Sequence, residues 1–487
     1  MNRVMGSLLH KFKREMMLIG PFRWLIFKFL EKKLYRAIVE KKDPNWISYN
    51  FPRRAREDNF YIMRAILETI NRGLNEKRIS KQVWRQSFDF ISVHLARKIG
   101  KAKTLFLKKY GFKPPALLAL SPTKLCNLKC LSCYSDSSPD NRETLSFKIV
   151  SRIIKEQKEL WGSHFTILTG GEPFAYNDGG RTILDLAAKH PDTFFLVYTN
   201  GTLINEETAQ KLAKLGNITP AISVEGLEKE TDERRGQGIH QKILRTFDYL
   251  RRAGVLFGVS ITPTRKNAEL ILSDELIDYY FNKIEVAYAW IFQYLAIGRD
   301  ANPDLMVTPE QRIAMFKRIW QLIKERKLPL MDFWNCGSVI GGCFAAGRPQ
   351  VGYIHINWNG DVTPCVFQPY SSQSIIEIYK NGGDLNSALF SPFFEKIRQW
   401  QKEAANPISC CPYRDHYELF HPFFSETGIK PVDKPAEKFL QDKEYRRQLI
   451  DYGRKFGSLS QKIWDEEYLS PEATNKNKRR DNQTRQN

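Results

Sequence analysis

Three cysteines, Cys126, Cys130 and Cys133, stand in a C-x3-C-x2-C spacing within one short segment. A [4Fe–4S] cube has four irons, so three thiolates leave one iron with an open position where a small molecule can bind. A zinc finger would need a second Cys or His pair nearby, whereas the next cysteine is Cys336. Eight cysteines in 487 residues, with no secretory signal, also do not form a secreted disulfide framework. The spacing therefore predicts an iron–sulfur loop with an open coordination site.

Downstream of this loop, short strand-like runs alternate with amphipathic helical stretches. The predicted strands are 165–169, 194–198, 218–224, 255–262 and 287–295, with helices such as 146–160 and 204–215 between them. Alternation at this length implies βαβ units and a parallel sheet. Polar and glycine-containing segments follow successive strands, namely Gly-Gly-Glu-Pro at 170–173, Thr-Asn-Gly-Thr at 199–202 and Glu-Gly at 225–226. These segments would lie at the carboxyl ends of the strands, where (β/α) barrels carry their chemistry.

This order of motifs resembles the radical S-adenosylmethionine (SAM) superfamily over roughly residues 115–300. The resemblance implies a partial (β/α)6 TIM-like barrel whose three loop cysteines hold a [4Fe–4S] cluster that binds SAM at its open iron. It also implies further cofactor contacts. Tyr134 would pack near the adenine, Gly170, Gly171, Glu172 and Pro173 would meet the SAM amino group, and Ser223, Glu225, Ser260 and Thr262 would lie near the ribose and carboxylate. A Ser or Thr at a strand end is as often a turn residue as a ligand contact, and a turn role is the alternative for the residues assigned to the ribose and carboxylate.

The resemblance further implies a reaction. An electron from a donor of the ferredoxin or flavodoxin type cleaves SAM to methionine and a 5′-deoxyadenosyl radical, which abstracts hydrogen from an unactivated C–H bond. The protein positions the target and excludes water. A non-catalytic basic Fe–S adaptor is the most different alternative, but a purely structural cluster would have no use for the strand-end motifs.

A second group of cysteines lies beyond the expected barrel. Two short apolar runs flank an Asn-Gly turn at 359–360, which predicts a β-hairpin between Cys343 and Cys365. Gly360 and Cys365 make a G-x4-C element similar to that of SPASM and twitch domains, although the denser SPASM cysteine pattern is missing. The resemblance implies one auxiliary [4Fe–4S] cluster held by Cys343, Cys365 and Cys411, with Cys410 or Cys336 as a fourth ligand. Buried free thiols are the alternative.

The net charge of +21 is concentrated at the two ends of the chain. Residues 1–110 carry 26 Lys and Arg against 9 Asp and Glu, and residues 476–487 carry five basic residues and one acidic. Two basic amphipathic helices are predicted on either side of Gly20-Pro21. In the second, an apolar face is opposed by Arg23, Lys28, Lys32, Lys33 and Arg36. No apolar run is long enough to cross a bilayer, so the helices are predicted either to lie on an anionic membrane surface or to pack on the barrel.

Together these signals predict an α/β protein in four parts. These are a basic helical extension (1–110), a radical SAM core (111–305), a small α+β auxiliary-cluster domain (306–430), and a helical segment with a basic disordered tail (431–487). The predicted substrate is membrane-associated, such as a lipid, and the enzyme would be cytoplasmic, at the inner face of the membrane. A peptide- or protein-modifying maturase is the alternative. Nucleic acid is not expected as a partner, because no recognition motif accompanies the charge.

Overall fold

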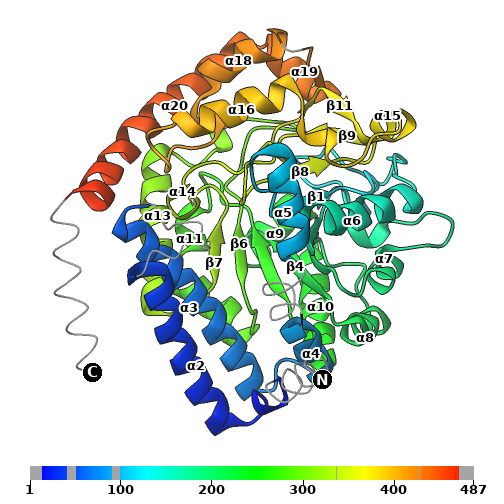
Figure 1. Cartoon of the computed structure of the whole chain (residues 1–487), viewed down its shortest axis with the longest axis vertical. Coiled ribbons are helices and arrows are strands. Elements are labelled where there is room, and N and C mark those ends of the chain that lie inside the picture. The colour runs from blue at the N-terminus through cyan, green and yellow to red at the C-terminus, as the bar shows by residue number, and fades with distance from the viewer. Residues whose placement is uncertain (1–13, 41–50, 90–98, 336, 427, 471–487) are drawn as a thin grey trace.

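The computed structural model describes residues 14–40, 51–89, 99–335, 337–426 and 428–470. Within these residues the main sheet has ten strands in the order β11-β9-β8-β1-β2-β3-β4-β5-β6-β7 (Figure 1). Its central strands are β1 (Leu117–Leu120), β2 (Phe165–Leu168), β3 (Phe194–Thr199), β4 (Ile218–Val224), β5 (Gly258–Ile261) and β6 (Ala289–Ile291). Neighbouring strands in this series pair in parallel. The predicted partial barrel with six parallel strands is therefore confirmed.

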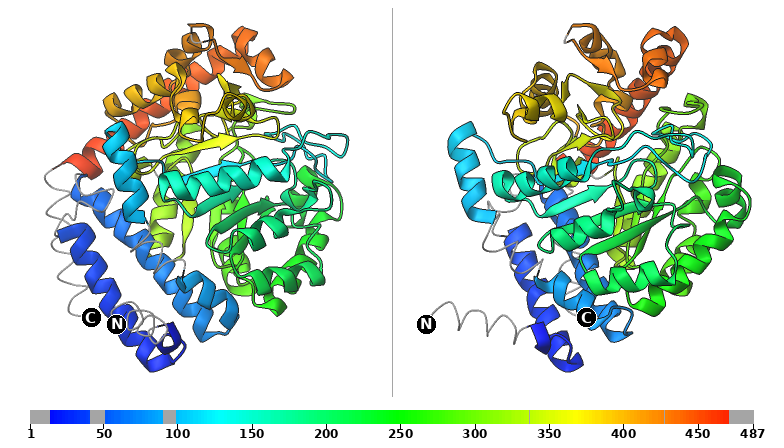
Figure 2. Two further views of the ribbon diagram at one scale, coloured as in Figure 1. Left: turned by 45° about the vertical axis from the view of Figure 1, so that its right-hand side comes forward. Right: turned by 90° about the vertical axis from the view of Figure 1, so that its right-hand side faces the viewer.

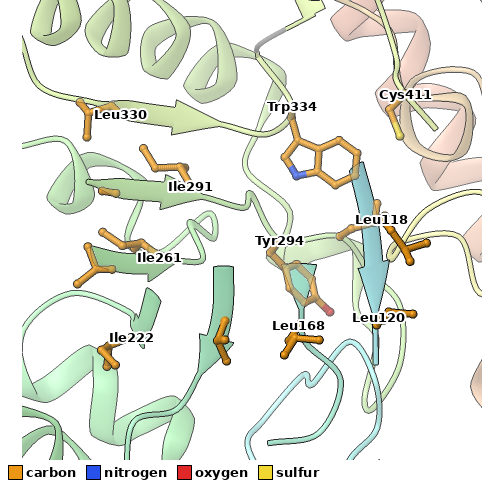
Figure 3. Packing of buried hydrophobic residues seen from close by; sticks show 14 of the residues in the cluster. Leu118, Leu120, Leu168, Ile222, Ile261, Ile291, Tyr294, Leu330, Trp334 and Cys411 are labelled. Carbon is orange, nitrogen blue, oxygen red and sulfur yellow. The ribbon is translucent and has the colours of Figure 1, made fainter. Parts of the chain in front are cut away.

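Helices connect these strands and cover the outside of the sheet. They include α6 (Phe147–Trp161), α7 (Ile183–Lys189), α8 (Glu206–Leu215), α9 (Glu228–Arg235), α10 (Ile239–Ala253), α11 (Ala268–Ile271) and α12 (Asp274–Asp278). Successive side chains of a strand point to opposite faces. Leu118 and Leu120 are fully buried in the core cluster that Figure 3 shows, whereas Leu117 and Ala119 line the interior of the barrel. The same strands thus build the core and the wall of a cavity.

The sheet continues past residue 305, the predicted end of the barrel. After α13 (Pro309–Glu325), β7 (Leu330–Asp332) pairs in parallel with β6. The predicted hairpin is present as β8 (Tyr353–Ile356) and β9 (Asp361–Thr363), with Gly360 at a φ of +83° in its turn. Strand β8 also pairs in parallel with β1. The hairpin between Cys343 and Cys365 therefore extends the barrel sheet at its other edge.

The remaining C-terminal elements form a layer over this hairpin (Figure 1). They are α14 (Gly337–Ile340), β10 (Tyr370–Ser371), β11 (Gln373–Ser374), α15 (Ile375–Lys380), α16 (Pro392–Glu403), α17 (Pro412–Asp415), α18 (Tyr417–Glu426), β12 (Lys430–Pro431), α19 (Lys434–Gln441) and α20 (Lys443–Ile463). The first turn of helix α16 is capped by Ser391, which accepts a hydrogen bond from the Phe394 amide at 3.2 Å. The predicted tail at 476–487 lies outside the described residues.

The N-terminal extension is helical, as predicted. It consists of α2 (Gly20–Tyr35), α3 (Arg53–Asn75), α4 (Lys81–Asp89) and α5 (Ile99–Tyr110). In Figure 2, α2 lies alongside α3 in both views. The first predicted amphipathic helix falls mainly on residues outside the described part. None of the described helices is long and apolar enough to cross a membrane.

One face of α2 differs from the sequence prediction. Arg23, predicted on the solvent side, is only 4% exposed. Its guanidinium donates to the Met17 carbonyl at 2.9 Å and to Asn71 Oδ1 at 3.2 Å. Because acceptors on the segment before α2 and at the C-terminal end of α3 satisfy the charge, Arg23 occupies the packed face, and large apolar side chains of α2 face outward instead.

Candidate active site

A cavity of about 1440 Å³ opens at the carboxyl ends of the barrel strands. It brings together most of the cofactor-site residues predicted from the sequence, namely Cys126, Cys130, Cys133, Tyr134, Gly170, Gly171, Glu172, Ser223, Ser260 and Thr262. Pro173 and Glu225 are not among its lining residues. Pro173 is buried at the start of a short 3-10 helix (Pro173–Ala175). Glu225 lies behind Arg234 and Arg235, which line the cavity.

The three cysteines of the first loop are free thiols that line this cavity. The Leu128 amide donates to Cys126 Sγ at 3.4 Å, and Asn200 Nδ2 lies 3.8 Å from the same sulfur. Burial raises the pKa of Cys126 to about 12 and also raises that of Cys130, so both thiolates need a cation to form. Within the described chain, no group of His, Cys, Asp or Glu side chains is arranged for a single metal ion. The three thiols line one cavity, which suits an iron–sulfur cluster.

Two arginines that the sequence analysis did not single out hold this loop in place. Arg299 donates to the Cys130 carbonyl at 2.9 Å and to the Ser137 carbonyl at 2.7 Å. Arg234 donates to the carbonyl of Ser132 at 3.2 Å. These arginines are distant in sequence from the loop they hold, so spacing alone gives no signal for them. The loop is therefore ordered by charge-assisted hydrogen bonds to its backbone.

The two glycines of the Gly-Gly-Glu-Pro segment allow a close approach between backbones. A Cβ at Gly171 would stand 2.2 Å from the Leu125 carbonyl oxygen. The Gly171 amide donates to the Thr123 carbonyl at 2.9 Å and the Glu172 amide donates to Leu125 at 2.8 Å. An amino group donates hydrogen bonds, so this segment can meet one through its carbonyl oxygens or the Glu172 carboxylate, while the amides serve to hold the segment. The glycines thus position the residues immediately before Cys126.

Glu172 connects the ends of two neighbouring strands. Its carboxylate accepts hydrogen bonds from Thr199 Oγ1 at 2.6 Å, the Asn200 amide at 2.7 Å and the Phe174 amide at 3.0 Å. Burial raises the pKa of Glu172 despite these donors. The residue lines the cavity while three protein donors fix its orientation.

Glu225 follows β4 and is paired with two arginines. It is 1% exposed, and its carboxylate accepts from Arg234 Nη1 at 2.8 Å and from Arg235 Nε at 3.0 Å. Both guanidinium groups line the cavity, whereas Glu225 does not. The arrangement presents positive charge beside the cysteine loop, suited to a carboxylate group of a bound molecule. Two consecutive arginines at the end of α9 were visible in the sequence, but their direction was not.

Further inside the barrel the cavity wall is aromatic. The ring centroids of Tyr198 and Phe292 are 5.1 Å apart, and Phe292 lies 5.4 Å from Phe333. The charged residues among those lining the cavity are Glu172, Arg234 and Arg235, all at the cysteine end. The deep part of the cavity therefore suits an uncharged apolar or aromatic group.

The second group of cysteines lines an adjacent cavity of about 380 Å³. It contains Cys343, Cys365, Cys410 and Cys411, while Cys336 falls outside the described residues. Backbone amides donate to three of these sulfurs: Ala345 to Cys343 at 3.4 Å, Phe367 to Cys365 at 3.3 Å, and Arg414 to Cys411 at 3.4 Å. Burial raises the pKa of Cys365 to about 12 and that of Cys411 to about 11. Four convergent thiols with amide donors also suit an iron–sulfur cluster.

The two cavities share part of their walls. Phe333, Phe344 and Tyr353 line both of them, and Phe333 and Phe344 stand 4.9 Å apart between centroids. Phe333 follows β7 and Tyr353 begins β8. These rings therefore lie where the last barrel strand and the hairpin approach each other.

A buried polar network also links the two sites. The Arg312 guanidinium forms a bidentate ion pair with Asp415, at 2.6 and 3.1 Å. Asp415 in turn accepts from the Cys411 amide at 3.1 Å. Arg414 Nη1 donates at 3.0 Å to Gln293, which lines the first cavity. Although burial alone would raise the pKa of Asp415, the two guanidinium groups hold that pKa well below its usual range.

Comparison with known families agrees with this geometry. The model of the radical SAM superfamily matches residues 120–266. The chain is 27% identical over 347 residues to the mycofactocin maturase MftC of Mycolicibacterium smegmatis, covering 68% of this chain and 84% of that protein. It is 30% identical over 222 residues to the AdoMet-dependent heme synthase of Methanosarcina barkeri, covering 44% and 61%. It is 27% identical over 277 residues to the sporulation killing factor maturation protein SkfB of Bacillus subtilis, covering 54% and 63%.

The family match covers the cysteine loop and the strand-end motifs up to the end of β5. Enzymes of this superfamily work with SAM and a [4Fe–4S] cluster, and the match to the maturase MftC covers a larger share of this chain than the family model does. The parallel barrel, the open cavity and the four further thiols agree with that assignment. The chain is therefore a radical SAM enzyme with a C-terminal auxiliary-cluster domain.

Proposed function

We propose that this enzyme modifies a peptide or protein substrate by abstracting hydrogen from an uncharged side chain held in the aromatic part of the cavity. The observation that carries the proposal is the continuity of the two cysteine sites through shared aromatic walls. A substrate group in the first cavity lies directly against the rings that also line the second. Two of the three relatives compared above are maturation proteins, which favours a peptide over the membrane-associated lipid suggested by the sequence.

In this proposal Cys126, Cys130 and Cys133 hold the first cluster. When bound, the cluster and SAM together supply a 5′-deoxyadenosyl radical able to remove hydrogen from an unactivated C–H bond. Arg234 and Arg235 offer guanidinium groups to the carboxylate of the cofactor, and Glu225 acts behind them by keeping both oriented. Ser223, Ser260 and Thr262 offer hydroxyl groups on the opposite strand ends.

Cys343, Cys365, Cys411 and Cys410 would hold the auxiliary cluster. The surrounding protein supplies what such a cluster needs: amide donors to three sulfurs, and nearby guanidinium groups that offset negative charge. A second structural detail concerns Cys410. A Cβ at residue 337 would lie 3.0 Å from its sulfur, so this thiol is close to the segment that begins after Cys336.

The aromatic wall selects the substrate group and keeps water away from it. Tyr198, Trp290 and Phe292 surround the interior without a charged neighbour at that depth. A charged side chain would lose its hydration there without gaining a partner. We therefore infer that the modified residue is apolar or aromatic.

Mass spectrometry can test the substrate class directly. Reconstituted, reduced enzyme is incubated with SAM and, in separate reactions, with short peptides encoded beside its own gene, with a lipid extract of the source cells, and with iron coproporphyrin. The expected result is 5′-deoxyadenosine formation together with a mass change in a peptide. A mass change confined to the lipid would restore the lipid hypothesis. A change confined to the porphyrin would point to chemistry like that of the heme synthase relative.

A further inference from the structure

Helix α2 carries a cluster of exposed apolar side chains. On the helix and just before it, Ile19, Phe22, Trp24, Leu25 and Phe29 are 48%, 48%, 54%, 57% and 66% exposed. We name these five residues the α2 outer face. The other large apolar residues exposed in the described chain are scattered over several elements, such as Leu105 on α5 and Leu419 on α18. Single exposed apolar residues are ordinary, whereas several on successive turns of one helix mark an interaction surface.

The exposure does not arise from a detached helix. Phe27 is buried in a cluster with Met17 and Trp84, and Arg23 is hydrogen bonded to α3 on the same side. The rotation of α2 is thus fixed by packing on one face. The outer face is what this fixed rotation leaves uncovered.

Basic residues accompany the apolar ones. Lys28, Lys32, Lys33 and Arg36 are exposed along the same helix and its π-helical continuation (Arg36–Glu40). The Lys28 ammonium lies 4.4 Å from the centroid of the Trp24 ring, a cation–π contact on the surface. The only acidic residue of α2 is Glu31, which is partly buried.

We propose that the α2 outer face docks the enzyme on an anionic lipid bilayer. Its aromatic and aliphatic side chains would enter the interfacial region, while the lysines meet the anionic headgroups. Charge favours a bilayer over a protein partner, because the exposed charged residues that accompany this face on α2 and at the start of its continuation are lysines and an arginine, which complement anionic headgroups. A bilayer accepts any exposed apolar face whose flanks are basic.

The position of α2 separates this docking from the substrate site. Arg23 contacts Asn71 near the C-terminal end of α3, and the Ser80 amide that follows donates to the Gly254 carbonyl at 2.9 Å. Gly254 lies between α10 and β5, on the side where the barrel strands begin. The cysteine loop lies at the opposite ends of the strands. The bilayer would therefore hold the enzyme and leave the cavity mouth facing away, so this inference is independent of the proposed peptide substrate.

Vesicle co-sedimentation of the full-length enzyme tests the proposal. Phosphatidylcholine vesicles are compared with vesicles that also contain phosphatidylglycerol. We expect binding to the mixed vesicles that weakens as salt rises. The variant with Trp24→Ser, Leu25→Ser and Phe29→Ser should bind more weakly at every salt concentration. The variant with Lys28→Gln, Lys32→Gln and Lys33→Gln should lose about fivefold per lysine at low salt, and little at high salt.

A matched control uses exposed leucines elsewhere on the extension. Leu105→Ser with Leu107→Ser on α5, where the side chains are 59% and 41% exposed, should bind vesicles like the wild type. All variants should keep the wild-type thermal midpoint and SAM cleavage, because exposed side chains are changed. Failure of the wild type to bind anionic vesicles would overturn the proposal. So would a concentration-dependent dimer, seen by light scattering, that the α2 serine variant abolishes while vesicle binding stays unchanged.

Discussion

The two cysteine sites are built in opposite ways. The first is a loop of three thiols, each partly exposed, beside a cavity of about 1440 Å³. The second gathers four thiols around a cavity of about 380 Å³, and three of them, Cys365, Cys410 and Cys411, are buried. A site that must admit a small molecule keeps an open side, whereas a site that only holds a group can be closed by the fold. Substitutions at the first site should therefore mainly change reactivity, and substitutions at the second should mainly change stability.

Loss of the loop cysteines should produce the largest change in activity. Replacing Cys126, Cys130 and Cys133 together with Ala should abolish 5′-deoxyadenosine formation, because no ligand of the first cluster remains. The thermal midpoint should change little, since these side chains are partly exposed. Chromatography of the nucleoside product and a melting curve measure both effects. Persistent SAM cleavage in this variant would contradict the assignment of these cysteines as ligands of the SAM-binding cluster.

Loss of the second set of cysteines should lower the iron content while SAM cleavage continues. We expect about eight irons per chain after reconstitution, as two cubes of four. Replacing Cys343, Cys365 and Cys411 with Ala should leave about four and retain SAM cleavage, while substrate modification is lost. Iron is measured by elemental analysis. A wild-type value near four would mean that the second thiols are structural only.

Two arginine substitutions sharpen the contrast in stability. Arg312 and Asp415 are fully buried as a pair, so Arg312→Met should lower the free energy of unfolding by about 3–5 kcal/mol, because Asp415 loses its bidentate partner. Arg299 instead pairs with Asp136, which is 33% exposed, and donates to loop carbonyls.

Arg299→Met should therefore cost about 1 kcal/mol of stability and mainly slow SAM cleavage by disordering the loop. Urea unfolding and the nucleoside assay are run on both variants. Equal destabilisation by the two substitutions would contradict the difference between an open and a closed site.

A buried histidine at the junction of the two regions should give an effect that is confined to acidic pH. His355 lies between Ser121, at 2.8 Å, and Thr363, at 2.9 Å, and burial lowers its pKa to about 3. The unfolded chain takes up the proton near pH 6.5, so the folded state loses stability as the pH falls from about 6.5 toward 3.

Between pH 6.5 and 4.5 this histidine should account for a loss of about 2–3 kcal/mol. His355→Gln should flatten that part of the pH dependence of the free energy of unfolding, measured in urea. At neutral pH the free energies of the variant and the wild type should differ by a constant amount. An unchanged slope in the variant would show that His355 is solvated in the folded protein.

Much of the first site could be predicted because its residues are local in sequence. The cysteine spacing and the polar residues at the ends of successive strands can both be recognised from the sequence alone. Ten of the twelve predicted cofactor-site residues line one cavity. Glu225 shows the limit of that approach. Its place at a strand end suggested direct contact with the cofactor. Instead, Arg234 and Arg235 at the end of α9 bind its carboxylate and line the cavity themselves.

Other features depended on contacts between distant segments. The pairing of β8 with β1 joins residues more than two hundred positions apart, and no local pattern indicates it. Likewise, the outward direction of Phe22 and Leu25 depends on Arg23 finding acceptors at Met17 and on α3. The sequence showed an amphipathic helix there, but the burial of one satisfied arginine leaves apolar side chains exposed beside the lysines.

The pairing of β8 with β1 has a consequence for how the protein matures. A growing chain that has completed β1 to β7 still has β1 as an unpaired sheet edge, because its partner emerges last among the barrel strands. Open edges of this kind associate with other chains, and pairings of long sequence separation form slowly. The segment that supplies the second cysteine group therefore also acts as an intramolecular cover for the nascent barrel. A chain ending after β7 would be expected to aggregate during synthesis, even though all three cysteines of the first loop are present.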